Sequence, residues 1–306
     1  MSSNKQIYDE LERLLTEQRN RASSDIDVMD TLGILRVINN EDKLVAHAVE
    51  KQLSAIAEAV ELAVQVITSG GRLIYVGAGT SGRLGILDAA ECPPTFGTPP
   101  GVITGIIAGG KEAVFKSQEG AEDNVSAADV DLSSISLTRN DLVCGLAASS
   151  RTPYVIRALE YARTIGAKTV FVTTNHGIRS GIADVVIDPD VGPEVIMGST
   201  RMKSGTAQKL VLNMITTASM IRLGKVYENM MVDLQLTNQK LRERAKRIIM
   251  MATGVDYDGA THVLDASHGY VKTAIVMLTN RTGYEEAQSQ LKVAGGFVRA
   301  AIDARR

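Results

Sequence analysis

The sequence predicts an α/β fold: a doubly wound parallel sheet with flanking helices, followed by a small C-terminal helical domain. Two observations support this prediction. Through the middle of the chain, apolar runs of strand length alternate with helical patterns, which is typical of parallel strands joined by crossover helices on both faces. After Thr253 and Gly254 the pattern changes to short helical segments separated by turn residues.

The apolar runs and the patterns between them place the elements of the sheet. The five runs expected to form strands are Arg72–Val76, Val102–Ala108, Asp141–Ala148, Thr169–Thr174 and Asp184–Ile187. The helices expected between them lie around Gly82–Ala90, Gly120–Asp129 and Pro153–Ile165. Buried parallel strands read as nearly continuous apolar runs, as these do.

Helical patterns also flank the sheet. Apolar side chains follow one stripe from Glu41 to Ser69, which predicts one long helix. Ser199 or Thr200 is expected to cap another, ending near Arg222, and a further helix begins near Asp233. The short helices expected near the C-terminus are Asp258–Ala266, Tyr270–Leu278, Glu285–Val293 and Gly296–Ala304. We expect an N-terminal helical segment over 1–61, a sheet domain over 62–225 and a C-terminal helical region over 226–306.

Composition excludes several classes of protein. The chain has 306 residues, of which 44% are hydrophobic and 22% charged, and its formal net charge is −2, so it is an ordinary globular sequence. It has no basic patch for nucleic acid or an anionic membrane. The apolar stretch from Leu210 to Ile221 is too short to span a bilayer. Acidic residues near the N-terminus argue against a signal peptide, and Cys92 and Cys144 fit a reducing compartment, so we expect a cytoplasmic protein.

A glycine-rich loop follows the first predicted strand. Residues 77–82 read GAGTSG, which satisfies the G-x-G-x-x-G spacing of dinucleotide sites. Such sites also need an acid at the tip of the second strand, but that strand ends in AGGK. Backbone N–H groups at a helix start, together with the hydroxyls of Thr80 and Ser81 beside Gly79, suit a sugar phosphate better. A dinucleotide site and a purely structural turn remain the alternatives.

A second loop rich in hydroxyls follows the third predicted strand. Ser149, Ser150, Arg151 and Thr152 come directly before Pro153, at the expected start of a helix. An ordinary Ser/Thr helix cap is the alternative interpretation. Ligands of such sheets bind at the carboxyl ends of the strands, where both loops are expected. We therefore predict that these four residues bind substrate.

Other polar residues are weaker candidates. Arg201 and Lys203 are expected in the first turn of a helix, where cations disfavour the helix dipole but suit a substrate phosphate or carboxylate. A solvated basic pair is the alternative. Glu194 is expected to cap a loop. The histidines show no metal-ligand spacing: His47, His176, His262 and His268.

Four motifs together carry a family resemblance: GAGTSGRLGILDAAECPPTF, EGAED, AASSRTPYVI and GSTRMKSGTAQKLVLNM. The chain resembles, over nearly its whole length, the N-acetylmuramic acid 6-phosphate etherases of bacterial cell-wall recycling, which have the sugar isomerase (SIS) fold. One position departs from the family pattern, because Ser150 stands where the family usually has glycine. A serine there would be strained if the position requires a positive φ.

The resemblance implies cleavage of the D-lactyl ether, giving N-acetylglucosamine 6-phosphate and D-lactate. In the open-chain sugar the aldehyde acidifies the proton on carbon 2, so a base removes that proton and the lactate oxygen on carbon 3 leaves by β-elimination. Water then adds to the product. This chemistry needs one base and one acid but no metal or redox cofactor.

Two glutamates match the family's catalytic positions, Glu91 in AAECPPTF and Glu122 in EGAED. Glu91 is expected at a helix C-terminus, where the dipole raises a carboxyl pKa and favours the acid. Glu122 is expected to open a helix, where the dipole favours the ionised base. Capping charges in a first turn are the alternative for Glu122.

Two other functions on the same fold compete with the etherase. One is a non-catalytic sugar-phosphate-binding regulator, and the other is an aldose–ketose isomerase. The paired Glu91 and Glu122 favour the etherase, because a silent binder needs neither acid nor base. We also expect a homodimer, with the methionine-rich helix from Thr200 to Arg222 offering an apolar surface and with sites shared between subunits.

Overall fold

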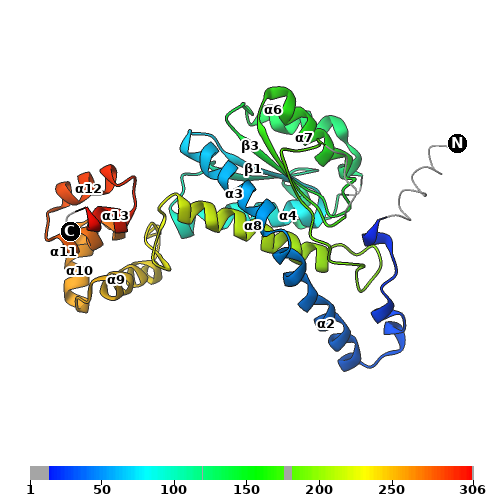
Figure 1. Ribbon diagram of the computed structural model, residues 1–306, viewed down its shortest axis with the longest axis horizontal. Helices are drawn as coiled ribbons and strands as arrows, with labels where there is room; N and C mark the ends of the chain where they lie inside the picture. Colours follow the sequence, from blue (N-terminus) through cyan, green and yellow to red (C-terminus); the bar gives the residue numbers. More distant parts are fainter. Residues whose placement is uncertain (1–13, 119, 176–180, 305–306) are drawn as a thin grey trace. The chain divides into compact units, whose positions relative to one another are not determined.

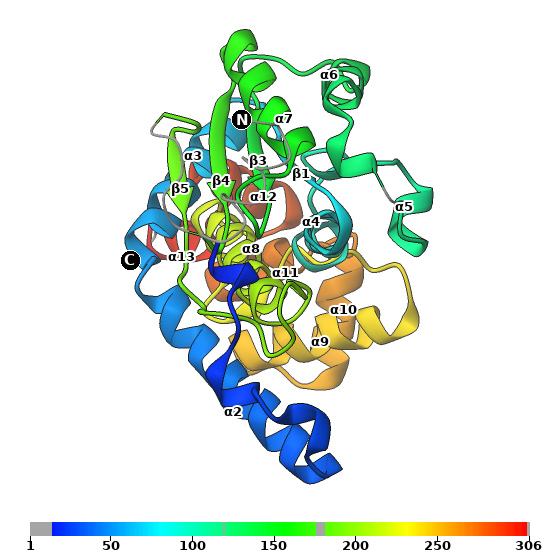
Figure 2. The same ribbon diagram turned by 90° about the vertical axis from the view of Figure 1, so that its right-hand side faces the viewer.

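A five-stranded parallel sheet forms the centre of the first part of the chain. The structure is a computed structural model and describes residues 14–118, 120–175 and 181–304. The strands are β1 (Leu73–Gly77), β2 (Ile103–Ile107), β3 (Leu142–Leu146), β4 (Lys168–Val172) and β5 (Val185–Ile187). They pair in the order β2-β1-β3-β4-β5, of which β1, β3, β4 and β5 are labelled in Figure 2. The predicted parallel sheet is confirmed, with strand ends within one or two residues of the apolar runs.

Helices cover both faces of the sheet. On one face, Ile74, Val76 and Val143 pack in a buried cluster with side chains of α6 (Val125–Ser134) and α7 (Pro153–Ile165). Tyr75 points to the opposite face, because successive strand residues alternate, and it packs closely on Gly85 of α4 (Gly79–Phe96). Figure 1 shows α6 and α7 on one side of the strands, with α3 (Leu53–Thr68), α4 and α8 (Lys203–Arg222) on the other.

The long helix predicted from Glu41 to Ser69 is wrong, because the structure has two helices there. They are α2 (Thr31–Glu50) and α3, separated by a turn at Lys51 and Gln52. The Gln52 side-chain oxygen accepts a hydrogen bond from the backbone N–H of Asp188, at 3.4 Å. This distant contact holds the turn, whereas the apolar stripe continues through it and hides the break.

The predicted cap of α8 is also wrong. The helix begins at Lys203, and the cap is the carboxylate of Glu194 rather than Ser199 or Thr200. Glu194 is fully buried and accepts hydrogen bonds from the backbone N–H groups of Lys203 and Ser204, each at 2.9 Å. A carboxylate satisfies the first N–H groups of a helix better than a hydroxyl does, because the helix dipole favours the anion. Glu194 therefore caps a helix, whereas the sequence predicted that it caps a loop.

Chain contacts divide the protein into two compact units. The sheet unit comprises residues 1–90 and 101–216, and the helical unit comprises residues 91–100 and 217–306. Short elements complete the described part of the sheet unit: η1 (Leu15–Glu17), η2 (Arg21–Ser23), η3 (Ile26–Val28), α5 (Glu112–Phe115) and η4 (Ala121–Asp123). A small antiparallel hairpin of β6 (Val226–Tyr227) and β7 (Met230–Met231), absent from the prediction, opens the second segment of the helical unit.

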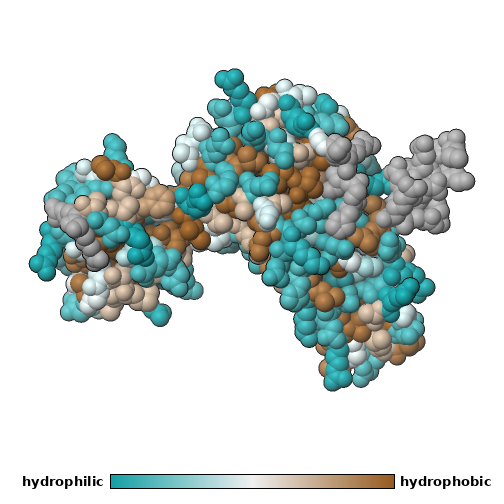
Figure 3. All heavy atoms as spheres, viewed as in Figure 1, coloured by the Kyte–Doolittle hydropathy of each residue, from teal (hydrophilic) through white to brown (hydrophobic). Residues whose placement is uncertain are grey.

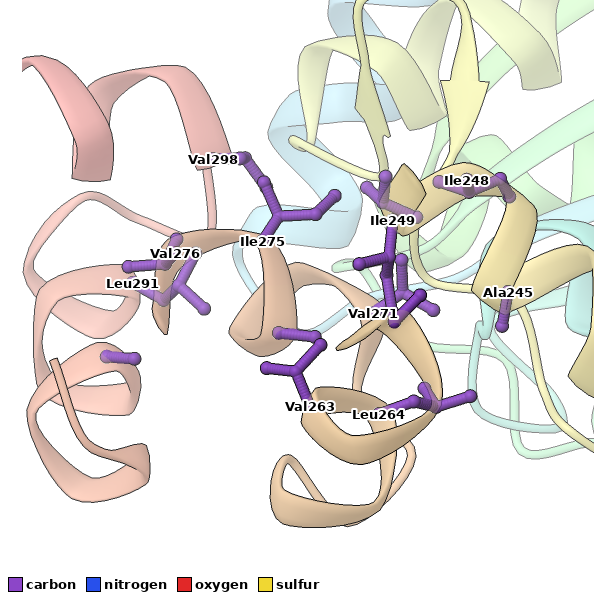
Figure 4. Close-up of a cluster of buried hydrophobic side chains, with 14 of the residues drawn as sticks. Ala245, Ile248, Ile249, Val263, Leu264, Val271, Ile275, Val276, Leu291 and Val298 are labelled. Carbon is purple, nitrogen blue, oxygen red and sulfur yellow. The ribbon is translucent and has the colours of Figure 1, made fainter. Parts of the chain in front are cut away.

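The helical unit has a core of its own. Its helices are α9 (Gln239–Thr253), α10 (Tyr257–Ala266), α11 (Val271–Asn280), α12 (Tyr284–Val293) and α13 (Val298–Asp303). Figure 4 shows Ile249 of α9, Leu264 of α10, Ile275 of α11 and Val298 of α13 among its buried side chains. The predicted series of short C-terminal helices is confirmed.

Candidate active site

The two predicted substrate loops lie at the same edge of the sheet. β1 is flanked by β2 on one side and β3 on the other, so the strand order reverses at β1. The loop after β1 contains Thr80, and the loop after β3 contains Ser149. In open parallel sheets, ligands bind at this reversal, in the crevice outside the carboxyl ends of the strands.

The first loop has a backbone that only glycine accommodates easily. Gly79 has φ +53°, and a Cβ atom there would meet open space. Gly82 packs so closely that a Cβ atom would lie 2.6 Å from the Ile107 side chain. Because α4 begins at Gly79, the first N–H groups of that helix have no intrahelical acceptors. This arrangement presents N–H donors to an anion.

A contact from α8 supports this loop. The Ser81 hydroxyl donates a hydrogen bond to the side-chain oxygen of Gln208, at 2.8 Å, and both side chains are buried. Within the described residues, the Gln208 side-chain nitrogen is buried without a hydrogen-bond partner. Sequence reasoning missed Gln208, although a polar residue beside the apolar, buried Ala207 and Val211 was a usable signal.

The second loop contains the one departure from the family pattern. Ser150 has φ +58°, in the left-handed region that favours glycine. The Ser149 hydroxyl oxygen accepts a weak hydrogen bond from the N–H of Arg151, at 3.4 Å. Thr152 is the N-cap residue of α7, but among the described residues its side chain makes no capping hydrogen bond. The helix-cap interpretation therefore does not explain the Thr152 hydroxyl.

Glu122 lines a pocket together with the first loop. The pocket has a volume of about 300 Å³ and is also lined by Gly79, Arg83 and Gln118. Arg83, which sequence reasoning missed, donates to the backbone oxygens of Val114 and Ala113, at 2.9 and 2.8 Å. These two hydrogen bonds hold the segment after β2 beside α4. Glu122, the predicted base, and the first loop therefore line the same pocket.

The helix start predicted at Gly120 is wrong. Glu122 is exposed and lies in the single turn η4, and α6 begins later, at Val125. The side chain of Asn124 caps α6 by accepting the N–H of Ala127, at 3.1 Å, which sets the later start. Glu122 therefore precedes α6 instead of standing in its first turn.

Glu91 belongs to the helical unit and does not end its helix. α4 continues through Pro93 and Pro94 to Phe96, so the predicted end near Ala90 is wrong. The prolines remove two backbone N–H donors without stopping the helix. Glu91 is exposed. Because Glu91 does not lie at the end of α4, the helix dipole does not give the expected reason for its role as the acid.

The two cations at the start of α8 differ. Arg201 is exposed and precedes α8, so its predicted place in the first turn is wrong. Lys203 is only 1% exposed, and its ammonium lies 2.6 Å from the carboxylate of Glu41. Burial acts to raise the pKa of Glu41, but hydrogen bonds from Lys203 and Asn20 outweigh it, so this pKa lies below its usual value. The Lys203 ammonium is engaged within the protein.

Among the residues described, no three or more His, Cys, Asp or Glu side chains gather as they would around a metal ion. Within the same residues, no helix combines the length and apolar character needed to cross a membrane. His176, one of the four histidines considered above, lies outside the described residues.

Comparison with known proteins decides the family. An N-acetylmuramic acid 6-phosphate etherase from Salinibacter ruber is 58% identical over 99% of this chain and 98% of its own length. The chain belongs to this family. Etherases of the same name from Geobacillus thermodenitrificans and Pectobacterium atrosepticum are 55% and 53% identical, over 96% and 94% of this chain and 100% and 96% of theirs.

More distant similarities agree with the fold. The glucokinase regulatory protein N-terminal SIS domain matches residues 55–163. The solved structure of a phosphoheptose isomerase from Francisella tularensis has a TM-score of 0.50 and 15% identity, covering 62% of this chain and 98% of that one. The SIS-type sheet and the family resemblance are both confirmed.

Proposed function

We propose that this protein cleaves the D-lactyl ether of N-acetylmuramic acid 6-phosphate and releases N-acetylglucosamine 6-phosphate and D-lactate. The observation that carries the proposal is the 58% identity to an etherase over 99% of the chain. The site supports it, because Gly79 of the first loop and Glu122 line one pocket. A non-catalytic regulator of the same fold would not need a carboxylate there. An isomerase would not be expected to match an etherase over 99% of the chain.

The loops of the sheet unit hold the sugar phosphate in this proposal. The N–H groups at the start of α4 and the hydroxyls of Thr80 and Ser81 bind one part of it, with Gly79 allowing close approach. The second loop, Ser149 to Thr152, adds hydroxyls and the Arg151 guanidinium. Arg201, which is exposed, supplies a cation for a substrate anion, whereas the buried Lys203 is paired with Glu41 and positions the start of α8 instead of contacting the substrate.

The reaction proceeds by elimination and hydration. Glu122 takes the proton from carbon 2, the electron pair forms the carbon 2–carbon 3 double bond, and the bond from carbon 3 to the lactyl oxygen breaks. Glu91 protonates the departing oxygen, so D-lactate leaves. Water then adds its hydroxyl to carbon 3 and a proton to carbon 2. Each proton transfer contributes about 10²–10⁴ in rate.

A direct assay tests this function. Purified protein incubated with N-acetylmuramic acid 6-phosphate should release D-lactate, measured with a D-lactate dehydrogenase. Because the residues supply both acid and base, the rate should survive dialysis and a chelator. No release of D-lactate by folded protein would refute the etherase, and activity restored only by a metal or nicotinamide cofactor would refute the mechanism.

We also propose a cytoplasmic homodimer. The chain has only two cysteines, Cys92 and Cys144, both buried, and so low a cysteine content suits a reducing compartment. On α2, Leu32, Leu35 and Leu44 are each more than half exposed, and apolar atoms appear among the polar surface of that region in Figure 3. A second copy of this chain would cover such side chains.

Sedimentation tests the dimer. The wild type should sediment as a dimer, and Leu35→Glu should shift it toward the monomer. The matched control is Arg36→Glu, which changes an exposed neighbour without removing an apolar side chain. A monomeric wild type would contradict the proposal, as would an unchanged dimer in Leu35→Glu.

A further inference from the structure

The helical unit contains a large cavity of its own. Its volume is about 1170 Å³. It is lined by the segment after β7, the start of α11, the exposed side of α12 and the glycines that follow α12. Pockets for small molecules usually measure about 300–1,000 Å³, so this cavity is large enough for a metabolite. None of its lining residues belongs to the sheet unit or carries a role in the reaction proposed above.

Cations outnumber anions at the wall of this cavity. The ammonium groups of Lys225 and Lys272 lie 3.0 and 2.7 Å from the same oxygen of Asp233. Among the described residues, Asp233 is the one carboxylate within ion-pair distance of either lysine. In this cluster one negative charge faces two positive charges. Lys292 and Glu285, which also line the cavity, offset each other in charge, so an excess of one positive charge remains.

Burial makes this excess charge costly. The Lys272 side chain is only 12% exposed. Burial lowers its pKa, Asp233 opposes that shift, and the neighbouring Lys225 ammonium adds to it. An anion bound beside both ammonium groups would offset the burial and the repulsion together. Charge-assisted hydrogen bonds to carboxylate or phosphate oxygens would replace contacts with water.

The cluster is held in place before any ligand binds. The backbone of Gly97 approaches Asp233 so closely that a Cβ atom on Gly97 would lie 2.2 Å from the Asp233 backbone oxygen. Opposite, Gln288 donates a hydrogen bond to the hydroxyl of Thr273, at 2.8 Å, and both residues line the cavity. These neutral polar groups suit the hydroxyls of an organic ligand, whereas the lysines suit its acidic group.

We propose that this cavity is a binding site for a small organic anion, whose carboxylate or phosphate group is held by Lys225 and Lys272. The site differs from the substrate loops of the sheet unit in position and in chemistry. It uses two lysine side chains and one carboxylate, whereas the loops use backbone N–H groups and hydroxyls. The inference stands whether or not the protein is an etherase.

The test follows Lys272 itself in the full-length protein. Lysines labelled with ¹³C at Cε are observed by NMR, and the Lys272 signal is identified by its loss in Lys272→Arg. Inorganic phosphate and D-lactate are titrated separately at constant ionic strength, with chloride as the balancing salt. At least one of them should shift the Lys272 signal to saturation, and the anion that does so identifies phosphate or carboxylate as the preferred group.

Variants show whether the cluster causes that shift. Lys225→Met should raise the midpoint concentration about tenfold, because it removes one charge-assisted hydrogen bond. Lys240→Met is the matched control, since Lys240 is exposed on α9 and does not line the cavity, and its midpoint should equal that of the wild type. The proposal is overturned if neither anion moves the Lys272 signal, if the shift never saturates, or if Lys225→Met leaves the midpoint unchanged.

Discussion

The two edges of the central sheet use polar side chains in opposite ways. At the amino ends of the strands, Arg72 precedes β1 and Asp141 precedes β3, and their side chains form an ion pair at 2.7 Å with Asp141 buried. Arg72 also donates to the backbone oxygens of Ile135 and Ser136, at 2.9 and 3.1 Å. Asp184, before β5, accepts from the N–H and hydroxyl of Thr169.

At the carboxyl ends some polar groups are exposed or do not serve the local secondary structure. Glu122 is exposed beside a pocket, and the Thr152 hydroxyl does not cap its helix within the described residues. Ser150 adopts a backbone conformation that favours glycine. The polar groups at the amino ends stabilise the sheet, whereas the Glu122 carboxylate at the carboxyl ends is exposed toward the pocket. Substitutions at the two edges should therefore separate stability from activity.

The largest expected effect is the loss of the proposed base. Glu122→Gln should slow both carbon 2 proton exchange in deuterated water and D-lactate release, each by about 10²–10⁴. Glu91→Gln should slow D-lactate release more than exchange, because the proton leaves before the lactyl oxygen departs. NMR of the sugar measures exchange. Asp123→Asn, an exposed neighbour in the same turn, is the control. Wild-type rates in either glutamine variant would refute that residue's role.

The corresponding change at the amino edge should affect stability instead. Asp141→Asn removes the charge that pairs with Arg72 and weakens the bond from the backbone N–H of Thr138. Because Arg72 is 28% exposed, the pair is partly buried, and breaking it should cost about 1–3 kcal/mol of unfolding free energy. Urea denaturation measures this loss, with Asp42→Asn, an exposed aspartate of α2, as the control. Equal stability of the two variants would contradict the role given to this edge.

The same ion pair predicts a pH dependence. Burial acts to raise the pKa of Asp141, but Arg72 and the N–H of Thr138 outweigh it, so the folded pKa lies below the unfolded one. The pair therefore stabilises the fold fully above the unfolded pKa of about 4 and loses this effect as the pH falls through the folded pKa. Unfolding followed between neutral and acidic pH should show the wild-type advantage over Asp141→Asn shrinking toward low pH. A constant advantage would contradict the assignment.

A smaller effect is expected from loss of the hydrogen bond between Ser81, in the loop after β1, and Gln208 of α8. Gln208→Leu removes the acceptor of the buried Ser81 hydroxyl, which costs about 1–3 kcal/mol. Because the loop then loses its support, KM should rise more than kcat falls. Gln65→Leu, an exposed glutamine of α3, is the matched control. An unchanged KM in folded Gln208→Leu would show that α8 does not position the loop.

The smallest expected effect concerns the serine in the family's glycine position. Ser150→Gly should relieve left-handed strain and stabilise the fold by at most about 1 kcal/mol, since glycine also loses more entropy on folding. Ser136→Gly is a matched control, because Ser136 also has a positive φ, +51°, but lies at the opposite edge. There its backbone oxygen, which glycine keeps, accepts a hydrogen bond from Arg72. Both variants should gain similar stability, and only Ser150→Gly should change KM. A KM change in both, or in neither, would contradict the comparison.

The sequence predicted the sheet well because local patterns determine it. Buried parallel strands appear as apolar runs, and Pro153 marks the start of α7 as expected. The errors come from contacts between distant residues. Asp188 meets Gln52 at the break between α2 and α3, and Ser81 meets Gln208 across 127 positions. Patterns of neighbouring residues in the sequence do not predict these two contacts.

Competition between capping residues explains two further errors in the site, whereas the error at Glu91 arises because α4 continues through Pro93 and Pro94. Asn124 starts α6 later than the acidic run suggested, and Glu194 outcompetes Thr200 at the start of α8. The predicted substrate loops and Glu122 nevertheless lie at the carboxyl edge, because the topology of a parallel sheet brings the segments that follow its strands together.

One paired measurement tests the division between the two edges most directly. The rate of D-lactate release per folded molecule is measured for the wild type, Glu122→Gln and Asp141→Asn, with the folded fraction of each taken from its own urea curve. We predict that Asp141→Asn keeps the wild-type rate per folded molecule although it is much less stable. Glu122→Gln should lose at least about a hundredfold in rate at wild-type stability. An active, wild-type-like Glu122→Gln, or an Asp141→Asn that is stable but inactive, would contradict the account.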